Sequence, residues 1–238
     1  MLGEMMEEFK PVILVPTYNE ALNIKSFIEE VFKVCPDIHM LVIDDNSPDN
    51  TAEIVHSMCD RRIFILKRAK KSGLASAYID GFRYAVNIGF NAFIEMDADF
   101  SHNPKYLPLM LENLKKYDFV IGSRNIKGGG VENWSFVRNL ISKAGSLYAR
   151  GILFCPIKDL TGGFNGWNLN VIKEIGLDNI ISKGYSFQIE MKYKAYKKGF
   201  KFVEFPIIFP DRKLGVSKMS KDIFIEAMKN VFKIRFSK

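Results

Sequence analysis

The stretch NAFIEMDADFSHNP, residues 91–104, decides how the rest of the sequence is interpreted. An apolar run from Ala92 to Met96 has the length and composition of a buried β-strand, and it continues directly into two aspartates separated by one residue. A turn sequence that ends in Pro104 follows. The carboxylates of Asp97 and Asp99 repel each other, so either solvent or a bound cation must relieve that repulsion.

Similar apolar runs alternate with helical patterns through the first half of the chain. Strands are predicted at residues 12–16, 40–44, 62–66, 92–96 and 118–122, and helices at residues 23–34, 51–58, 74–88 and 104–116. Such alternation is typical of an α/β fold, in which helices cover both faces of a mostly parallel sheet.

The second half is less regular. We expect helices at residues 135–154, 187–198 and 221–236, a strand at 201–209, and a mobile loop at the glycines of 127–130. No linker or repeat interrupts the sequence, so it predicts a single domain over residues 1–238, with one half at 11–125 and the other at 126–238.

Composition excludes several classes of protein. The three cysteines and three histidines are scattered, which argues against a disulfide framework or a zinc site and favours a reducing cytoplasm. No segment approaches the roughly 18–20 apolar residues of a membrane span, so a soluble or peripheral protein is expected.

The net charge of +7 is unevenly distributed. From residue 183 onward there are fourteen Lys and Arg against five Asp and Glu, a net charge of +9, whereas residues 1–182 carry −2. The basic end predicts an anionic partner, which could be a phosphorylated substrate, an anionic lipid surface or nucleic acid.

Polar clusters follow three of the predicted strands. They are PTYNE at residues 16–20, DDNSPDN at 44–50 and DADFS at 97–101. Ligands of open parallel sheets bind beyond the carboxyl ends of the strands, so these acidic loops are expected to converge on one crevice. A lone D-x-D is more often a solvated turn, but three converging acidic loops favour bound Mg²⁺ or Mn²⁺.

An ordered set of motifs now resembles a known family. VPTYNE, VIDDNSPDNT, SGLASAY, MDADFSHNP, GSRNIKGGGVENW and DLTGGFN, in this order, look like those of the family 2 glycosyltransferases with a GT-A fold. Within that family the sequence is most similar to the dolichyl (polyprenyl) phosphate mannose synthases. The resemblance covers residues 11–231.

The resemblance implies a role for each matching residue. The base and ribose of the sugar nucleotide would lie against Pro16, Tyr18, Glu20, Ile43 and Asp45. The D-x-D element would be Asp97, Ala98 and Asp99, with metal bound by Asp99, by Asp97 and by Ser101. Cations around the phosphates would be Arg124, Arg138, Arg212 and Lys218. His102 is expected to shape the turn before Pro104.

Electrostatics supports such a cationic set independently. Joining a lipid phosphate to a sugar on a nucleoside diphosphate brings anions together, at about 3 kcal/mol for each charge pair 5 Å apart and an effective dielectric constant of 20. Arginine suits the task because its planar fork binds phosphate oxygens bidentately and stays charged. The acceptor phosphate is already ionised near pH 7, so a single inverting displacement is expected to need no general base; if one is used, Asp99 is the candidate.

The resemblance also implies the partners. It implies a metal-dependent transfer of mannose from GDP-mannose to dolichyl or polyprenyl phosphate, at the cytoplasmic face of a membrane to which the protein binds peripherally. Residues 11–125 would bind the nucleotide sugar, and residues 126–238 the acceptor. Residues 141–154 and 222–236 combine apolar and basic residues, as interfacial helices do. A separate membrane subunit is a further possible partner.

Two alternatives stay open. One is a UDP-sugar donor, with glucose or N-acetylglucosamine in place of mannose. The other is a non-catalytic adaptor that docks to membranes, which the retained acids and arginines disfavour. Nucleic acid is not expected as a partner, because no binding motif is present and the acidic crevice would repel the backbone.

The sequence departs from the family pattern at several positions. Relatives often have glycine where this chain has Asn46 and Asn50, and again where it has Ala75. Asn165 occupies a place that is frequently arginine. These departures leave the nucleotide and metal positions intact and bear on the specificity for the sugar and the acceptor.

Overall fold

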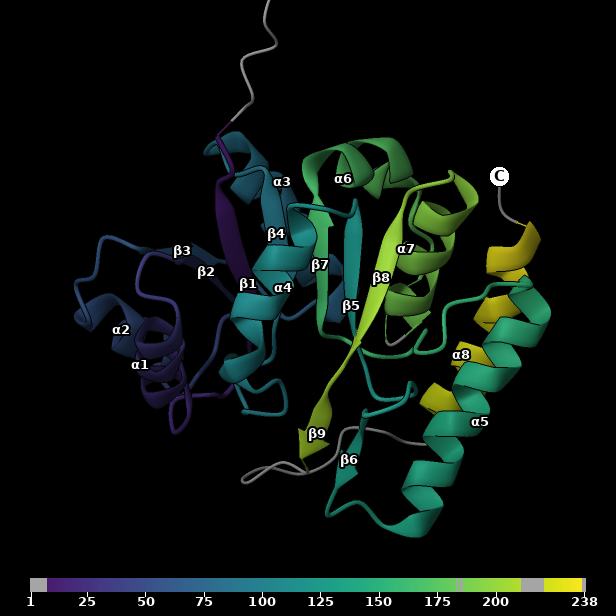
Figure 1. Ribbon diagram of the computed structural model, residues 1–238. Helices are drawn as coiled ribbons and strands as arrows, with labels where there is room; N and C mark the ends of the chain where they lie inside the picture. Colours follow the sequence, from purple (N-terminus) through teal and green to yellow (C-terminus); the bar gives the residue numbers. More distant parts are fainter. Residues whose placement is uncertain (1–7, 183, 185, 211–220, 237–238) are drawn as a thin grey trace, which may run out of the picture.

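The computed structural model describes residues 8–182, 184, 186–210 and 221–236. Its centre is a seven-stranded sheet in the order β3-β2-β1-β4-β7-β5-β8 (Figure 1). The strands are β1 (Pro11–Thr17), β2 (His39–Asp44), β3 (Ile63–Lys67), β4 (Ala92–Glu95), β5 (Phe119–Ser123), β7 (Asn165–Asn168) and β8 (Phe202–Pro206). Neighbouring strands are parallel except for β7, which runs antiparallel to both β4 and β5.

Helices cover both faces of this sheet. They are α1 (Ile24–Val34), α2 (Thr51–Ser57), α3 (Leu74–Asn87), α4 (Leu107–Leu114), α5 (Phe136–Leu153), α6 (Leu169–Ile175), α7 (Ser186–Lys197) and α8 (Lys221–Phe236). Two short 3₁₀ helices are η1 (Pro104–Tyr106) and η2 (Leu177–Asn179). The predicted α/β fold with a mostly parallel sheet is therefore confirmed.

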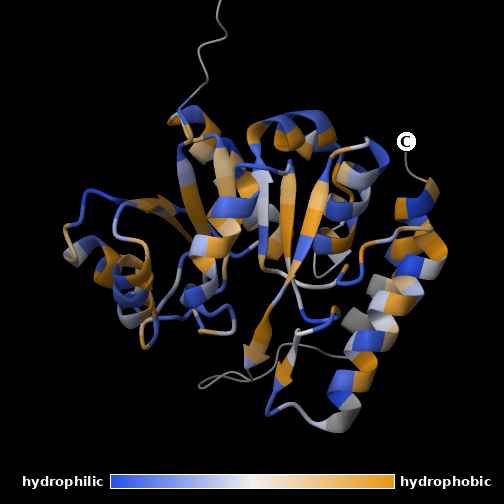
Figure 2. Cartoon of the chain, in the orientation of Figure 1, coloured by the Kyte–Doolittle hydropathy of each residue, from blue (hydrophilic) through white to orange (hydrophobic). Residues whose placement is uncertain are grey.

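The apolar runs of the sequence are buried because the sheet has a core on each face. Val12 and Leu14 of β1 contribute to the core that includes α3 and α7, whereas Ile13 and Val15 contribute to the core that includes α1 and α4. All four side chains are fully buried. Strands buried on both faces lack the apolar–polar alternation of one-sided sheets, which is why these strands read as continuous apolar runs (Figure 2).

The strand β7 was not predicted. Its sequence, Asn-Gly-Trp-Asn, contains no apolar run. It fits between β4 and β5 because Gly166 lets α4 approach closely: a Cβ at this position would lie 2.7 Å from Cδ1 of Leu114 and 2.8 Å from Sδ of Met110. The segment forms a central strand because it allows close packing of α4, and not because of its strand propensity.

A second small sheet corrects two further predictions. β6 (Gly130–Glu132) pairs in parallel with β9 (Ile208–Pro210), so the prediction of a mobile loop at 127–130 is wrong for its last residue. The strand predicted at 201–209 divides into β8 and β9 at Ile207, whose N–H donates to the carbonyl of Ser123. Gly129 packs so closely that a Cβ there would lie 2.4 Å from that same carbonyl oxygen.

Two asparagines have the backbone conformation that glycine favours. Asn46 and Asn50 have φ values of +58° and +64°, in the left-handed region. Asparagine tolerates this region better than most residues, which explains the departures from the family pattern at both positions.

The two predicted halves share one sheet, because β7 and β8 from the second half join β4 and β5 from the first. The boundary between residues 125 and 126 stays a prediction. Among the described residues, no helix combines the length and apolar character needed to cross a membrane.

Candidate active site

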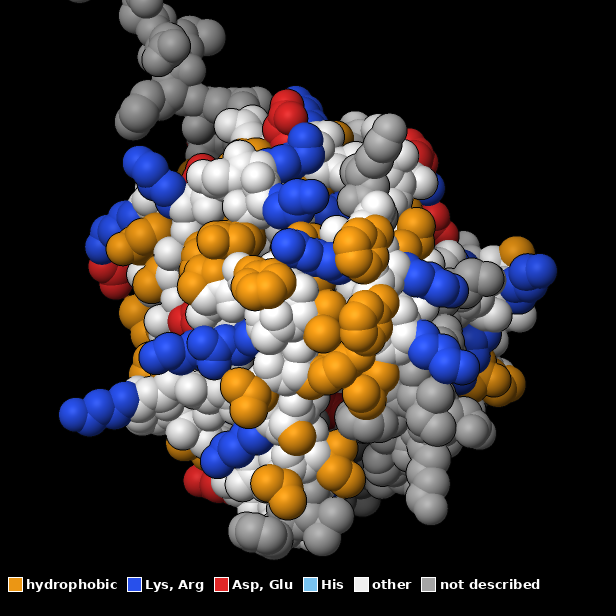
Figure 3. Space-filling view, turned by 90° about the vertical axis from the view of Figure 1, so that its right-hand side faces the viewer, with side chains coloured by type: hydrophobic (Ala, Val, Ile, Leu, Met, Phe, Trp, Pro, Cys, Tyr) orange, Lys and Arg blue, Asp and Glu red, His pale blue; other side chains and the backbone are white. Residues whose placement is uncertain are grey.

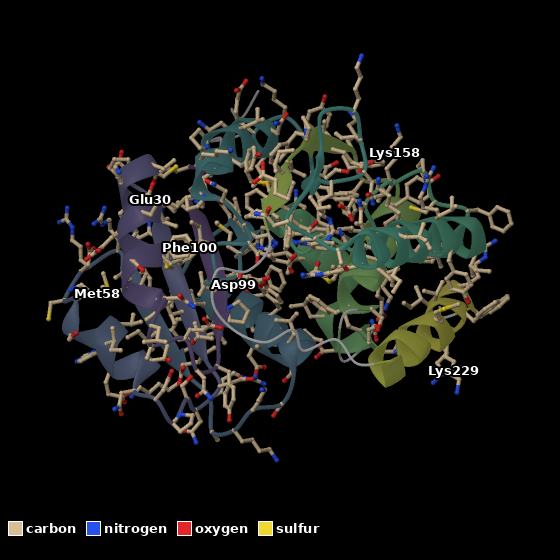
Figure 4. All side chains as sticks on the ribbon, turned by 90° about the horizontal axis from the view of Figure 1, so that it is seen from below. Glu30, Met58, Asp99, Phe100, Lys158 and Lys229 are labelled. Atoms are coloured by element: carbon tan, nitrogen blue, oxygen red, sulfur yellow. The ribbon has the colours of Figure 1, made fainter. Side chains whose placement is uncertain are left out.

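An acidic loop, residues 97–103, follows β4 at the carboxyl edge of the sheet, onto which Figure 4 looks. The backbone N–H of Asp97 donates to Nδ1 of His102 at 3.0 Å, and the backbone N–H of Ser101 donates to Oδ1 of Asp99 at 3.0 Å. His102 is buried and closes the loop on itself. This confirms the prediction that His102 shapes the turn.

Phe100 anchors the middle of the acidic loop. It adopts a left-handed φ of +62°, which is costly for a bulky residue, and its ring packs edge-on against Phe27 of α1 with centroids 5.7 Å apart. Figure 4 shows Phe100 on the α1 side of the labelled Asp99. Packing against α1 thus stabilises the backbone geometry that places the aspartates on either side of Ala98.

The donors in this loop fit a hard divalent cation. Asp97 is about one-third exposed (35%), Asp99 is mostly buried (8%), and the buried Oγ of Ser101 has no hydrogen-bond partner among the described residues. The described part of the chain contains no group of three or more His, Cys, Asp or Glu side chains with metal-binding geometry. Two carboxylates and a hydroxyl suit Mg²⁺ or Mn²⁺, which take their remaining oxygens from phosphates and water.

Acidic side chains connect the loop after β1 to the loop after β2, which are the next two strands beyond β4 in the sheet. Asp44 accepts hydrogen bonds from the hydroxyls of Thr17 and Ser47, at 3.1 and 2.6 Å. Asp49 accepts from the backbone N–H of Ala21 at 3.0 Å. These contacts join residues 16–21 after β1 to residues 44–51 after β2, so both loops present one surface at the sheet edge.

The predicted nucleotide-binding residues lie on that surface. Pro16 of β1 pairs in register with Ile43 of β2. Tyr18 is partly exposed, and Nζ of Lys71 lies 3.8 Å from the centre of its ring. Glu20, also partly exposed, accepts a hydrogen bond from the side-chain amide of Asn23 at 3.0 Å.

Asp45 is held by a residue that sequence reasoning missed. It forms a buried ion pair with Arg68, which also donates to Asp80 at 3.0 Å and to Ser76. Arg68 follows β3, so three consecutive parallel strands contribute to this corner of the site. The only available signal was its position in the basic run after the third predicted strand.

Arg124 is anchored by a buried carboxylate, Asp159. Its Nε and Nη2 donate to Oδ2 and Oδ1 of Asp159 at 2.8 and 2.7 Å, and Nη2 also donates to Thr161 at 3.0 Å. Burial opposes ionisation of Asp159, but the adjacent Arg124 charge and its hydrogen bonds outweigh burial and hold the pKa of Asp159 well below its usual range. Nε and Nη2 of Arg124 are thus already hydrogen-bonded within the protein. The predicted contact of Arg124 with a phosphate stays a prediction, and it would fall to Nη1.

Aromatic rings connect the arginines to the acidic loop. Cζ of Arg138 lies 3.9 Å from the ring centre of Trp134, and Cζ of Arg124 lies 5.9 Å from the same ring. Phe209 contacts Trp134 and Arg124, and its centroid is 5.5 Å from that of His102. The two predicted arginines therefore lie around Trp134, and Phe209 lies between Arg124 and His102 of the acidic loop.

A buried polar network lies beneath this edge, between the sheet and α7. The side-chain amide of Asn165 lies 2.8 Å from Oε2 of Glu95 and 2.7 Å from Oε1 of Gln188. Burial raises the pKa of Glu95 to about 7, against the lowering effect of the hydrogen bond from Asn165. The residue that replaces the family's frequent arginine thus links β4, β7 and α7.

Lys192 of α7 is fully buried and fixes the loop that carries Asp159. Its Nζ donates to the carbonyls of Asp159, Leu160 and Gly162 at 3.0, 3.3 and 2.6 Å. Burial lowers the pKa of Lys192 to about 8, although the charges of Asp159 and Glu95 oppose that effect. No motif pointed to Lys192, because its role depends on carbonyl groups that sequence does not reveal.

The structure thus brings most of the predicted site together at one edge of the sheet, on strand ends and loops except for Arg138, which lies in the first turn of α5. These residues are Pro16, Tyr18, Glu20, Ile43, Asp45, Asp97, Ala98, Asp99, Ser101, Arg124 and Arg138. The predicted cationic positions Arg212 and Lys218 lie outside the described residues. The individual roles assigned to these residues stay predictions.

Sequence comparison agrees with this arrangement. The family model for glycosyl transferase family 2 matches residues 12–176, which include the acidic loop, both arginines and Asp159. The chain belongs to glycosyl transferase family 2. The resemblance found in the motifs is therefore confirmed, and the protein is a glycosyltransferase.

Two curated relatives extend the similarity beyond the family match. The chain is 39% identical over 223 residues to the polyprenol monophosphomannose synthase of Mycolicibacterium smegmatis, covering 92% of this chain and 84% of the relative. It is 41% identical over 220 residues to the undecaprenyl-phosphate mannosyltransferase of Micrococcus luteus, covering 92% and 90%.

Solved structures of more distant glycosyltransferases share the fold. Glucosyl-3-phosphoglycerate synthase from Mycobacterium tuberculosis, in a complex with Mn²⁺ and UDP, has a TM-score of 0.67 at 14% identity, covering 95% of this chain and 78% of that one. A mannosyltransferase from Pyrobaculum calidifontis, in complex with GDP-Man and Mn²⁺, has a TM-score of 0.60 at 15% identity, covering 95% and 63%. These similarities confirm the predicted GT-A fold.

Proposed function

We propose that this glycosyltransferase moves mannose from GDP-mannose to the phosphate of a polyprenyl lipid at a membrane surface. The observation that carries the proposal is the similarity over 92% of the chain to two relatives whose names specify mannose and a polyprenyl acceptor. The site supports it, because an acidic loop suited to a metal diphosphate lies beside two arginines suited to a second phosphate.

The donor side of the site would be formed by the loops after β1, β2 and β4. Asp97, Asp99 and Ser101 would hold Mg²⁺ or Mn²⁺, which supplies positive charge to the departing diphosphate when it is bound. Tyr18 and Asp45 would contact the nucleoside, and the ion pair with Arg68 keeps Asp45 in one orientation.

The acceptor side would be formed by Arg124 and Arg138. Anchoring by Asp159 and packing on Trp134 restrict both guanidinium groups before any ligand binds, so little ordering entropy is lost when phosphate arrives. An oxygen of the lipid phosphate would form a bond to the anomeric carbon as the bond from that carbon to the diphosphate breaks, with inversion. The phosphate is already ionised near neutral pH, so this chain needs no side chain to remove a proton.

A docking face for the membrane would be provided by α5 and α8. Large apolar side chains are exposed there, namely Leu140, Ile141, Leu147 and Phe154 at α5, and Phe232 and Phe236 on α8. Leu140 and Leu147 are seven residues apart and so share one side of α5, and Phe154 is the residue that caps its end. Figure 3 looks at this side of the molecule and shows apolar side chains gathered between Lys and Arg, the composition of an interfacial surface.

The two helices of the docking face are fixed to each other. The hydroxyl of Tyr148 donates to the carbonyl of Met228 at 3.4 Å, and the Tyr148 ring packs edge-on against Phe232 with centroids 6.2 Å apart. Arg235 donates to the carbonyl of Leu153 at 3.3 Å and lies over the ring of Phe154. The exposed apolar side chains are thus presented by a rigid pair of helices.

A donor-competition assay tests the proposed reaction. Purified protein is incubated with radiolabelled GDP-mannose, UDP-glucose or UDP-N-acetylglucosamine, with a polyprenyl phosphate in detergent, and with Mn²⁺, Mg²⁺ or a chelator. We expect label in the lipid fraction from GDP-mannose alone, and only when a divalent ion is present. Transfer from a UDP-sugar would replace the proposed donor, and absence of transfer from every donor would refute the proposed reaction.

A further inference from the structure

A cavity of about 330 Å³ lies between α5 and the loop that follows β5. It is lined by Arg124, Asn125, Ile126, Gly129, Lys143, Ser146, Leu147, Arg150 and Lys158. Four of these nine residues are basic and none is acidic. Residues 143, 146, 147 and 150 follow helical spacing, so one side of α5 forms a wall of this basic cavity.

Three of the four cations are available to a ligand. Asp159 neutralises Arg124. Within the described part of the chain, Lys143, Arg150 and Lys158 have no carboxylate within 4.0 Å, and the buried Nε of Arg150 has no hydrogen-bond partner. Glu204 accepts from the backbone N–H groups of Lys158 and Asp159, at 2.8 and 3.0 Å. The side-chain charges therefore leave an electropositive cavity that favours an anion.

The basic cavity adjoins the predicted active site and shares Arg124 with it, but its other cations are different residues. Its lining includes neither a residue of the acidic loop nor Arg138. Figure 4 shows the labelled Lys158 well apart from the labelled Asp99 at the middle of the sheet edge. A volume of about 330 Å³ is at the small end for organic ligands, so it suits a phosphate headgroup better than a nucleotide sugar.

The cavity also adjoins the docking face. Leu147 lines the cavity, is 67% exposed, and belongs to the apolar side of α5. A ligand with its phosphate among the lysines would have apolar surface beside it on the same helix. That combination matches a phospholipid, whose charged headgroup and acyl chains are joined through glycerol.

We propose that the basic cavity binds the phosphate headgroup of an anionic membrane phospholipid, distinct from the polyprenyl acceptor. This inference rests on the proposed membrane docking through α5 and α8. The bound headgroup orients the docking face on the bilayer and brings the acceptor side of the site to the lipid surface. Free phosphate shares the same chemistry, so the experiment separates the two sources.

The test measures binding to sedimented vesicles of phosphatidylcholine, with and without phosphatidylglycerol. The cavity variant is Lys143→Gln/Lys158→Gln, in which both exposed lysines lose their charge. The matched control is Lys25→Gln/Lys33→Gln, which removes the same charge from exposed positions on α1. We expect phosphatidylglycerol to strengthen binding of the wild type and the control, and the cavity variant to bind those vesicles about tenfold more weakly.

Each other result has a defined meaning. Equal losses of vesicle binding in both variants would show diffuse charge attraction and overturn the proposal. Unchanged binding in both variants would also overturn it. So would a wild-type protein that does not bind phosphatidylglycerol vesicles. Failure to bind phosphatidylcholine alone would count against the apolar docking face instead. If the cavity variant lost mannosyl transfer in detergent with saturating acceptor, the cavity would belong to the acceptor site. Saturable binding of inorganic phosphate with no vesicle dependence would identify a free phosphate site.

Discussion

Replacing Asp159 by asparagine breaks the ion pair that anchors Arg124. The side chain of Asp159 is 0% exposed and that of Arg124 is 9% exposed, so the substitution leaves a buried guanidinium without its counter-charge. Removing one partner of a buried ion pair costs about 3–5 kcal/mol. For a chain of this size, that corresponds to a fall in Tm of roughly 10 °C.

The cost has a recognisable pH dependence. The pKa of Asp159 in the folded protein is well below its unfolded value, so its stabilising contribution is present above the unfolded pKa of about 4 and is lost as the pH falls through the folded pKa. Asp159→Asn should therefore be destabilising throughout the neutral range, with a penalty that does not change between pH 6 and pH 8.

Urea unfolding followed by circular dichroism measures the penalty, and a double-mutant cycle assigns it. Arg124→Met alone leaves the Asp159 carboxylate buried and unpaired, whereas the double variant removes both charges. We expect the double variant to lose less stability than the two single variants added together, by at least about 2 kcal/mol. Additive losses, or a loss below about 1 kcal/mol for Asp159→Asn, would refute the claim that this pair is a desolvated anchor.

Three further predictions concern the metal site, the core and the buried lysine. Asp99→Ala should lower metal-dependent transfer by at least about 100-fold with an unchanged Tm, while Asp37→Ala on the surface has no effect; full activity of the first variant would remove the metal assignment. Gly166→Ala should cost about 1–3 kcal/mol in urea unfolding because α4 leaves no room for a Cβ, whereas Gly151→Ala, with nothing within 4 Å, should be neutral or stabilising; equal effects would contradict this packing. Burial lowers the pKa of Lys192 to about 8, so between pH 8 and 10 the unfolded chain binds a proton that the folded chain has released, and stability rises with pH. Lys192→Met should lose about 2 kcal/mol of that rise between pH 7.5 and 9.5, and an unchanged pH profile would show that Lys192 titrates normally.

Local sequence patterns predicted the elements that their own side chains determine. Runs such as residues 12–16 and 92–96 are buried on both faces of the sheet, and that burial leaves an unmistakable apolar signature. The acidic loop was found because three acidic clusters follow predicted strands, and the carboxyl ends of parallel strands meet at one edge of the sheet. Arg124 and Arg138 came from the family motifs, and the structure places them around one tryptophan.

Elements and contacts that depend on distant partners were missed. β7 exists because Gly166 admits α4, and β6 because Gly129 admits the carbonyl of Ser123. Arg68, Asp159 and Lys192 each pair with groups that are distant in sequence. Asp159 begins the DLTGGFN motif and Arg68 lies in a basic run, but neither pattern names the partner. The sequence therefore predicted most groups expected to meet ligands, but few of those that hold them in place.

The position and the direction of β7 determine how the loops of the predicted site are spaced. With one strand inserted between β4 and β5, the loops that carry Asp99 and Arg124 leave the sheet about 9.5 Å apart, twice the distance between adjacent strands. Because β7 runs the other way, its beginning and the preceding residues 159–164 reach the same edge and form a floor between those loops. That floor would lie beneath the transferred sugar, so we expect natural or engineered changes in residues 160–163 that keep the Asp159 anchor of Arg124 to alter sugar preference without touching the cation ligands.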